Sequence, residues 1–296
     1  MRARFPIALL TAGLALQAFP SVSLANSPSA VSSQPSPFTY ADLADLATNA
    51  PIVLHGAIRS MSQIKADRAP GLADGYARFY IESEIISLIR GVGPLSSHVQ
   101  YLVDLPLQAN GKPPKLMRKQ PVLIFAQPVA GTLAGSHSTN SIRLIAPDAQ
   151  LPWDAATESQ LRSILTESTR PDAPPAITAI ANGFHVRGTL PGEGETQLFL
   201  NTRTGEPVSL TIITAATGAR RWSAAFGEVV DENAAHPRVG TLGWYRLACG
   251  LPQSLPLEKL GGTAPEDRRK AAADYAYVLR ELGQCGRTRT PPPAAQ

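Results

Sequence analysis

Residues 52–59 read Ile-Val-Leu-His-Gly-Ala-Ile-Arg, with an apolar side chain or a glycine at every even-numbered position. Successive side chains of a β-strand point to opposite faces, so this alternation predicts a strand whose even-numbered positions share one face. Pro51 precedes the strand and ends a short helix, which begins at a capping box formed by Thr39 and Asp42. The region predicts a fold made mainly of strands, with a helix leading into the first.

Four further strands are predicted downstream, each as a short apolar or alternating run. They cover residues 77–89, 99–103, 122–125 and 141–146. The alternation changes phase at Ile85 and Ile86, which indicates a bulge or a strong bend. Asp154 then caps a second helix. Short, bent strands between two helices predict a small curled or closed barrel.

Four segments in this half carry a family resemblance. They are ADLADLA at 41–47, IVLHGAI at 52–58, YIESEIISLIRG at 80–91 and PVLIF at 121–125. Their order resembles that of exported bacterial proteins of unknown function, in which a helix precedes a Val-x-Gly-x-Val strand, a strand ending in Leu-Lys-Gly and a Val-Leu-Leu-Phe-Leu strand. Arg90 here replaces the usual Lys, and Ala126 stands where Leu is common. The resemblance covers residues 38–126 and implies an OB-like β-barrel, which we expect to extend over residues 38–168; it supplies no catalytic residues.

A proline-rich stretch divides the chain. Residues 170–176 read Arg-Pro-Asp-Ala-Pro-Pro-Ala, and prolines at this density are incompatible with a helix or a central strand. We therefore expect residues 169–176 to link the barrel to a second, separately packed domain at 177–286. Further strands are predicted at 177–180, 184–190, 196–201, 207–213, 222–230 and 242–248. Turn signals between them predict an antiparallel sheet or sandwich.

A C-terminal helix is predicted from a capping box at Thr263 and Glu266 to Gly283, followed by a mobile tail at 287–296. The predicted fold class is mostly β (α+β): a small OB-like barrel with flanking helices, then an antiparallel sheet or sandwich with a C-terminal helix.

The chain has two cysteines, Cys249 and Cys285. A pair of cysteines in an exported protein usually forms a disulfide, which would stabilise the fold by roughly 3–4 kcal/mol in the chain-entropy model. Cys249 follows the last predicted strand and Cys285 follows the terminal helix, so the bond would join that helix to the second sheet. The alternative is two buried free thiols.

Residues 1–25 have the order of a secretory signal peptide. Arg2 and Arg4 precede an apolar core at 6–19, and a small-x-small cleavage site stands at 23–25. We expect cleavage after this site and a periplasmic or secreted location; the alternative is an uncleaved N-terminal anchor. No later stretch is long enough to span a bilayer, so we expect no membrane span.

The mature chain would begin with a flexible Ser/Pro-rich linker at 26–37. Removal of Arg2 and Arg4 lowers the net charge from +4 to +2. So small a charge exerts little long-range attraction on phosphates, and we expect no nucleic-acid partner.

Three residues offer metal-ligating groups at regular spacing: Glu228, Glu232 and His236. On a helix they would face one way, and such nitrogen and oxygen ligands suit Zn²⁺ or Mn²⁺. The segment reads instead as the end of a strand and a turn. A solvated acidic turn is the better interpretation, and we expect no metal and no cofactor.

The histidines show no familiar catalytic motif. Ser136 and His137 are adjacent in a polar loop, but sequence neighbours seldom point the same way, and G-x-S-x-G and H-E-x-x-H are absent. His55 and His185 lie in predicted strands, where we expect packed or rim residues. His98 begins a strand and is assigned no role.

Two carboxylates, Glu193 and Glu195, flank Gly194 in a predicted hairpin turn. Paired carboxylates can perform glycoside hydrolysis, but two so close on a tight turn are expected to be solvated.

Arg78, Phe79, Tyr80 and Tyr101 could contribute to nucleic-acid binding on an OB-like barrel. Because Phe79 and Tyr80 are sequence neighbours in one strand, they point to opposite faces and do not form one stacking surface.

The sequence therefore predicts an exported, non-catalytic binding or scaffold protein of the bacterial envelope, whose partner is an unidentified envelope protein or surface component. The alternative is a periplasmic hydrolase whose Ser, His and acidic residues, or carboxylates, converge only in the fold. A cleft that holds a His within hydrogen-bond distance of a Ser or an acid would favour the hydrolase. An exposed apolar patch or an open sheet edge would favour the binding protein.

Overall fold

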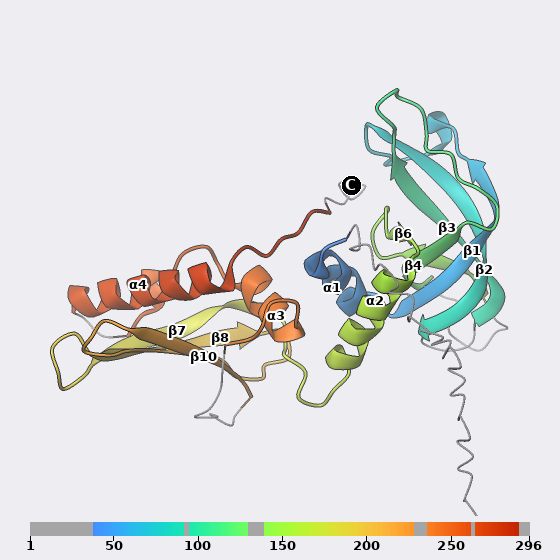
Figure 1. The fold of residues 1–296 in the computed structure, drawn as a ribbon. Helices are drawn as coiled ribbons and strands as arrows, with labels where there is room; N and C mark the ends of the chain where they lie inside the picture. Colours follow the sequence, from blue (N-terminus) through green and yellow to red (C-terminus); the bar gives the residue numbers. More distant parts are fainter. Residues whose placement is uncertain (1–37, 92–94, 130–138, 228–235, 262–263, 290–296) are drawn as a thin grey trace, which may run out of the picture. The chain divides into compact units, whose positions relative to one another are not determined.

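The computed structural model describes residues 38–91, 95–129, 139–227, 236–261 and 264–289 (Figure 1). The described residues form two sheets and four α-helices. Sheet A comprises β1 (Ile52–Gln63), β2 (Tyr76–Arg90), β3 (Leu95–Pro106), β4 (Pro121–Pro128), β5 (Thr139–Leu144) and β6 (Gln150–Pro152). Sheet B comprises β7 (Ile177–Arg187), β8 (Gly194–Thr202), β9 (Val208–Thr214) and β10 (Arg220–Phe226). The helices are α1 (Tyr40–Asn49), α2 (Ala155–Ser168), α3 (Leu242–Gly250) and α4 (Pro265–Leu282), with short 3₁₀ turns η1 (Ala66–Arg68) and η2 (Leu257–Lys259). The predicted α+β class, with an antiparallel second sheet and a C-terminal helix, is confirmed.

The strands of sheet A close on themselves. The pairing order β1-β2-β3-β5-β4 returns to β1, because β4 pairs with β1 as well as with β5 and β6. The β3–β5 pair is parallel and the other pairs are antiparallel. This order is compatible with the small barrel that the sequence predicts, whereas its assignment as OB-like stays a prediction.

Three local features predicted for the first half are confirmed: an irregularity in β2, the burial of β4 and the N-cap of α1. His55 pairs with Ser87 and Gly56 with Ile85, so the register skips Ile86 and forms the predicted irregularity in β2. The central residues of β4 are fully buried, as expected for an unbroken apolar run. Thr39 caps α1 as predicted: its hydroxyl accepts from the Asp42 amide at 3.2 Å, and the Asp42 carboxylate accepts from the Thr39 amide at 3.1 Å.

Sheet B has the order β10-β9-β8-β7, and α3 and α4 pack on one of its faces (Figure 1). Alternation along each strand separates a buried row from an outer one. Leu198, Leu210 and Ile212 are fully buried under the helices, together with the indole of Trp222 at the β10 side. The second sheet is therefore a single layer that α3 and α4 cover on one face.

Three predicted elements of the second half are corrected. Residues 242–248 form helix α3 and no strand: Thr241 caps it by accepting from the Trp244 amide. The buried residues of α3 lie on several sides of the helix: Leu242, Gly243, Trp244, Tyr245 and Leu247. The two strands predicted at 177–180 and 184–190 are one strand, β7, with a register irregularity between Ile180 and Asn182.

The remaining differences concern element ends. Strand β10 stops at Phe226, and residues 228–230 of the predicted strand lie outside the described residues. Helix α4 starts at Pro265 with Ala264 as its N-cap, and Thr263 of the predicted capping box lies outside the described residues.

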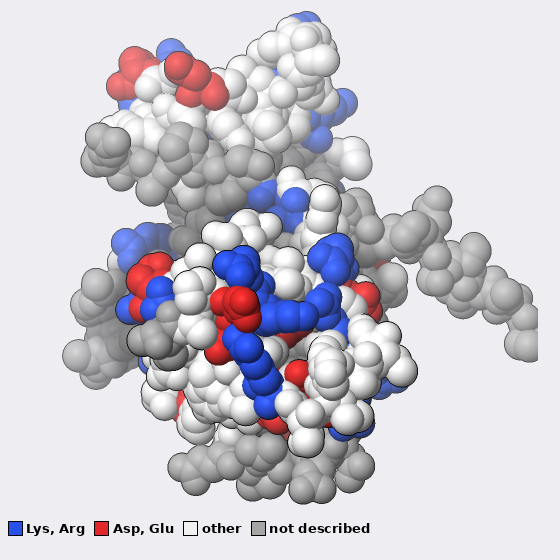
Figure 2. All heavy atoms as spheres, turned by 90° about the vertical axis from the view of Figure 1, so that its left-hand side faces the viewer, with Lys and Arg blue, Asp and Glu red and all other residues white. Residues whose placement is uncertain are grey.

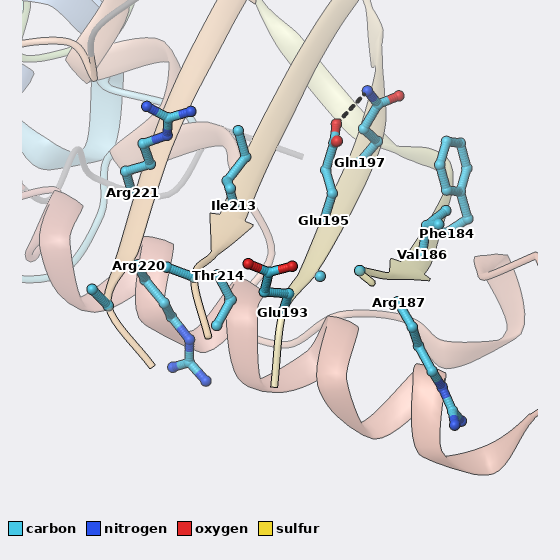
Figure 3. A pocket seen from close by; sticks show the side chains of 14 residues that line it. Phe184, Val186, Arg187, Glu193, Glu195, Gln197, Ile213, Thr214, Arg220 and Arg221 are labelled. Carbon is cyan, nitrogen blue, oxygen red and sulfur yellow. Dashed lines mark hydrogen bonds between the residues drawn. The ribbon is translucent and has the colours of Figure 1, made fainter. Parts of the chain in front are cut away.

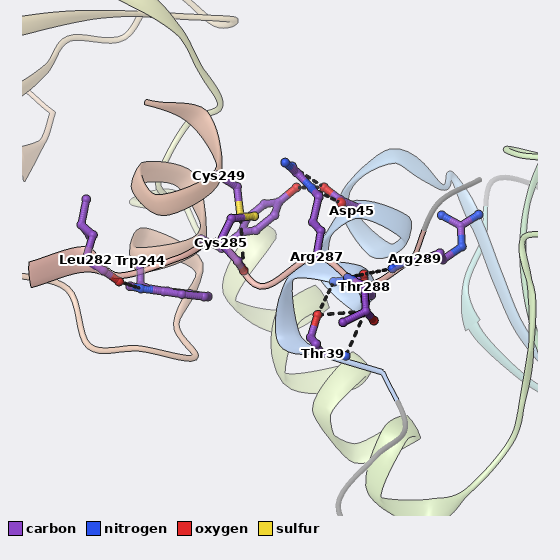
Figure 4. Close-up of a disulfide and its surroundings, with 11 residues drawn as sticks. Thr39, Asp45, Trp244, Cys249, Leu282, Cys285, Arg287, Thr288 and Arg289 are labelled. Carbon is purple, nitrogen blue, oxygen red and sulfur yellow. Dashed lines mark hydrogen bonds and ion pairs between the residues drawn. A yellow bond between two sulfur atoms is a disulfide. The ribbon is translucent and has the colours of Figure 1, made fainter. Parts of the chain in front are cut away.

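The predicted disulfide is present. Cys249 and Cys285 are bonded, with their Cα atoms 4.8 Å apart (Figure 4). Because Cys249 lies in α3, the bond joins α3 to the segment after α4, and not the sheet to that segment. The indole Nε1 of Trp244 in α3 donates to the Leu282 carbonyl at 2.9 Å, a second link between the same elements.

The segment after the disulfide lies along α1 (Figure 4). The guanidinium of Arg287 donates to the Asp45 carboxylate, and the Thr288 hydroxyl and Arg289 amide donate to Asp42 at 2.7 and 2.9 Å. Burial would raise the pKa of Asp42, but these hydrogen bonds outweigh it and lower that pKa. Residues 290–296 of the predicted tail lie outside the described residues, and the separate packing of residues 38–168 and 177–286 stays a prediction.

Among the helices of the described part of the chain, none combines the length and apolar character that crossing a bilayer requires.

Candidate functional site

Sheet B has a face that no described helix or strand covers, opposite α3 and α4. Its outward side chains include large apolar groups: Phe184 and Phe199 are each 37% exposed, and Val186 is 54% exposed. The two phenyl rings are neighbours, with centroids 6.2 Å apart and planes inclined at 43°. We call this surface, made of the outward residues of β7 to β10, the open face.

The strand register arranges the open face in cross-strand rows. One row runs across the four strands as Val186, Glu195, Ile213 and Arg221. The next row runs as Phe184, Gln197, Thr211 and Ser223. The two phenyl rings and Val186 thus lie on β7 and β8, the hydroxyls of Thr211 and Ser223 lie on β9 and β10, and Ile213 separates the charged Glu195 on β8 from Arg221 on β10.

A cavity of about 660 Å³ opens on this face (Figure 3). The first row and the beginning of the second line it, as do residues of the two adjoining hairpins. The amide of Gln197 donates to one Glu195 oxygen at 2.8 Å, and this bond holds both planar groups in place. Figure 3 shows Ile213 between Arg221 and Glu195, so the acid and the base do not meet. The volume lies in the range of about 300–1,000 Å³ that is typical of ligand pockets.

A chain of buried polar groups lies on the opposite side of the same strands, beneath α4. The Thr196 hydroxyl donates to the Asp274 carboxylate at 2.6 Å, and Nδ1 of His185 lies 2.9 Å from that hydroxyl oxygen. Arg220 places its Nε 3.1 Å from the other Asp274 oxygen. The chain links β7, β8 and β10 to α4.

The direction of these hydrogen bonds fixes the tautomer of His185. The Thr196 proton is committed to Asp274, so the Thr196 oxygen accepts the proton of His185 Nδ1. Nε2 of His185 then carries a lone pair. Burial lowers the pKa of His185, and the Asp274 carboxylate offsets this effect only in part, so the ring is neutral at neutral pH.

The ring of His185 depends on a glycine in the neighbouring strand. A Cβ on Gly194 would lie 2.7 Å from Nε2, which is closer than real contacts allow. The ring lines a second cavity of about 420 Å³, which also includes Lys270 and Thr214. Thr214 is buried, and its hydroxyl has no hydrogen-bond partner among the described residues.

His55, the other strand histidine, packs in the first half as expected. Its ring stacks on Trp153 with a centroid distance of 4.5 Å, and Nδ1 lies 3.2 Å from Glu158. Arg162 donates to the same carboxylate at 2.8 Å. Burial would raise the pKa of Glu158, but hydrogen bonds from Trp153 and Arg162 outweigh it and lower that pKa. The carboxylate is thus ionised and fully engaged, which suits a structural role.

Other sequence candidates fall in different places. Glu193 and Glu195 do line one cavity, although the Glu193 carboxylate turns back to accept from the Leu190 amide at 3.2 Å. Glu228, Glu232, Ser136 and His137 lie outside the described residues, while His236 stacks on Trp222. His98 contacts Ser97 and Arg59 on an exposed surface.

The proposed nucleic-acid set is not brought together. Phe79 and Tyr101 are core residues, and Tyr101 bonds to Gln150 at 2.7 Å. Arg78 is held by Asp104 in a double hydrogen bond, which leaves only Tyr80 exposed.

Charges at the end of sheet B and α4 are mixed. Figure 2 looks onto this end and shows Lys and Arg side chains crossing the surface with acidic side chains between them. Arg187, for example, pairs with Glu266 and Asp267 at 2.9 and 2.8 Å. The surface is therefore not a uniformly positive field of the kind that attracts polyanions.

Sequence reasoning singled out His185 and the two glutamates but missed the partners that give them context. Thr196 and Asp274 come from elements far apart in the sequence, and no local pattern links them to His185. The open face could in principle be predicted from the sequence, because Phe184, Val186 and Phe199 lie on one face once β7 and β8 are paired. The sequence matches no protein-family model, and no curated protein matches it.

Proposed function

We propose that this chain is an exported, non-catalytic binding protein of the bacterial envelope, and that it binds its partner on the open face of sheet B. The observation that carries the proposal is the cluster of Phe184, Phe199 and Val186, exposed on an uncovered sheet face beside a cavity of about 660 Å³. Soluble proteins rarely expose clustered large apolar groups without a binding role.

Export is supported by two independent features. The N-terminal residues 1–25 have the order of a signal peptide, and the chain's two cysteines are bonded to each other. Structural disulfides persist in oxidising compartments such as the periplasm and the extracellular space. Material from the envelope fraction should therefore begin near Asn26 on N-terminal sequencing.

A hydrolase remains the second candidate, because His185 lies within hydrogen-bond distance of a hydroxyl that is bonded to an acid. That geometry does not favour attack on a substrate. The Thr196 hydroxyl is fully buried, so a substrate has no access to it, and its proton is hydrogen-bonded to the Asp274 carboxylate rather than to His185. The arrangement serves better as a link between α4 and the sheet.

Co-sedimentation with envelope fragments of the producing cells tests the binding surface. The variants are Phe184→Ala/Phe199→Ala and, as a matched control, Leu102→Ala, which truncates an apolar side chain that is 46% exposed on β3. Wild type and the control should sediment alike. The double variant should bind about tenfold or more weakly, since truncating a contact aromatic typically costs over 1 kcal/mol. Unchanged sedimentation of a folded double variant would exclude the open face.

A further inference from the structure

We infer that the open face of sheet B binds a neutral saccharide chain; this rests on the proposed function and names its ligand. The cross-strand rows of the open face carry the inference, because their chemistry suits hydroxyl-rich ligands with apolar faces better than it suits a protein, a peptide or an anion.

The apolar side of the face offers aromatic surface. Phe184 and Phe199 are exposed and adjacent, and Val186 extends the same apolar area. A pyranose ring presents axial C–H groups with a partial positive charge, and these pack on the negative face of an aromatic ring. Two neighbouring phenyl rings therefore suit successive sugar units.

The row Val186, Glu195, Ile213, Arg221 decides between classes of ligand. Glu195 and Arg221 lie two strands apart, about 10 Å at the usual strand spacing, with Ile213 between them. No hydrogen bond or ion pair engages Arg221 within the described residues, and Glu195 has one oxygen that receives none there. A dry protein interface would bury both charges unpaired, at a high desolvation cost.

A saccharide resolves this difficulty, because each hydroxyl both donates and accepts. It can donate to the Glu195 carboxylate and, from the next sugar unit, accept from the Arg221 guanidinium. The second row continues the pattern: Gln197, Thr211 and Ser223 follow Phe184 across the sheet, so an amide and two hydroxyls stand beside the stacking surface.

Charge and backbone geometry argue against the other ligands. One acid and one base face outward in the first row, so the surface has no net charge to attract a phosphate polymer. An extended peptide gains most of its affinity by pairing with a strand edge, and the open face presents side chains only. A neutral saccharide chain lying across the strands is the ligand that uses every group of the two rows.

Isothermal titration calorimetry on the disulfide-bonded chain from residue 26 tests the inference. The probes are cellotetraose, maltotetraose, mannotetraose and chitotetraose, with dextran sulfate as the anionic comparison. At least one neutral tetrasaccharide should bind with a dissociation constant below about 1 mM, without dependence on salt. Phe184→Ala and Arg221→Ala should each weaken binding about tenfold, and Leu102→Ala should not change it.

The outcomes separate this inference from the proposed function. Suppose that no neutral tetrasaccharide binds at about 10 mM, while Phe184→Ala/Phe199→Ala abolishes co-sedimentation with envelope fragments. The inference of a saccharide ligand is then refuted, and the proposal that the open face binds a partner is retained. Saccharide binding that survives both Phe184→Ala and Arg221→Ala would place the ligand elsewhere. Tighter, salt-sensitive binding of dextran sulfate would overturn the neutral character of the ligand. Normal sedimentation of the double variant would refute the proposed function itself.

Discussion

Removal of the Asp274 carboxylate should destabilise the second half of the protein more than any surface change on α4. The carboxylate is buried, accepts from Thr196 at 2.6 Å and lies 3.1 Å from Arg220 Nε. In Asp274→Ala the Thr196 hydroxyl, which is fully buried, loses its acceptor, which costs about 1–3 kcal/mol. Arg220 is partly exposed and can rehydrate, so its loss adds less. We expect about 3 kcal/mol in total.

Urea unfolding followed by tryptophan fluorescence measures this change, because Trp222 in β10 and Trp244 in α3 are both buried in the second half. Asp267→Ala is the matched control: it removes an acid from the same helix whose partner, Arg187, is mostly exposed. That control should cost about 0.2–1 kcal/mol. If Asp274→Ala lowers the free energy of unfolding no more than Asp267→Ala does, the buried hydrogen bonds of Asp274 do not hold α4 to the sheet.

Three further changes probe the same region. Cys249→Ser/Cys285→Ser should lower the free energy of unfolding by about 4 kcal/mol, because the bond closes a loop with a sequence separation of 36; an unchanged urea midpoint would contradict this. Burial holds the pKa of the His185 ring below its ordinary value of 6.5, so as the pH falls the unfolded chain binds a proton at this ring before the folded chain does. The free energy of unfolding should therefore be constant above about pH 7 and fall as the pH drops through the folded pKa. In a pH series of urea melts, His185→Gln should reduce this dependence of stability on pH. Gly194→Ala would place a Cβ 2.6 Å from Cε1 of the His185 ring and should cost about 1–3 kcal/mol. Gly261→Ala, whose Cβ would meet only a carbonyl at 3.6 Å, should cost less than about 1 kcal/mol, and equal thermal melts of the two variants would argue against the clash.

The elements that the sequence predicts well are those whose signals are local. Alternation in residues 52–59 and the capping box of Thr39 and Asp42 report directly on backbone geometry, and both are confirmed. The sequence predicts a strand where helix α3 lies, because the apolar residues there are too dense to show a clear period of two or 3.6. Its N-cap at Thr241 was the available signal, since that hydroxyl accepts from the Trp244 amide.

The candidate site is harder to predict from the sequence than these elements, for a physical reason. His185, Thr196 and Asp274 meet only because β7 pairs with β8 and α4 lies across both, and a single sequence does not specify which strands pair. Glu195 and Arg221 likewise gain their meaning from being two strands apart on one face. Composition and motifs identify such residues singly, whereas their chemistry depends on register.

The ring of pairings in sheet A sets an order of folding. Gln63 of β1 pairs with Phe79 of β2 across a short connection, but Val53 of the same strand pairs with Phe125 of β4, 72 positions later. Loop-closure entropy makes the second pairing costlier by about 1.3 kcal/mol, so the β1–β2–β3 meander should form first. Until β4 is synthesised, the edge of β1 that will pair with β4 presents unpaired amides and carbonyls. A partly folded chain with this open edge is the state most prone to aggregate. A chain that ends before Pro121 should therefore form an open three-stranded sheet with two unpaired, aggregation-prone edges, and not a smaller barrel.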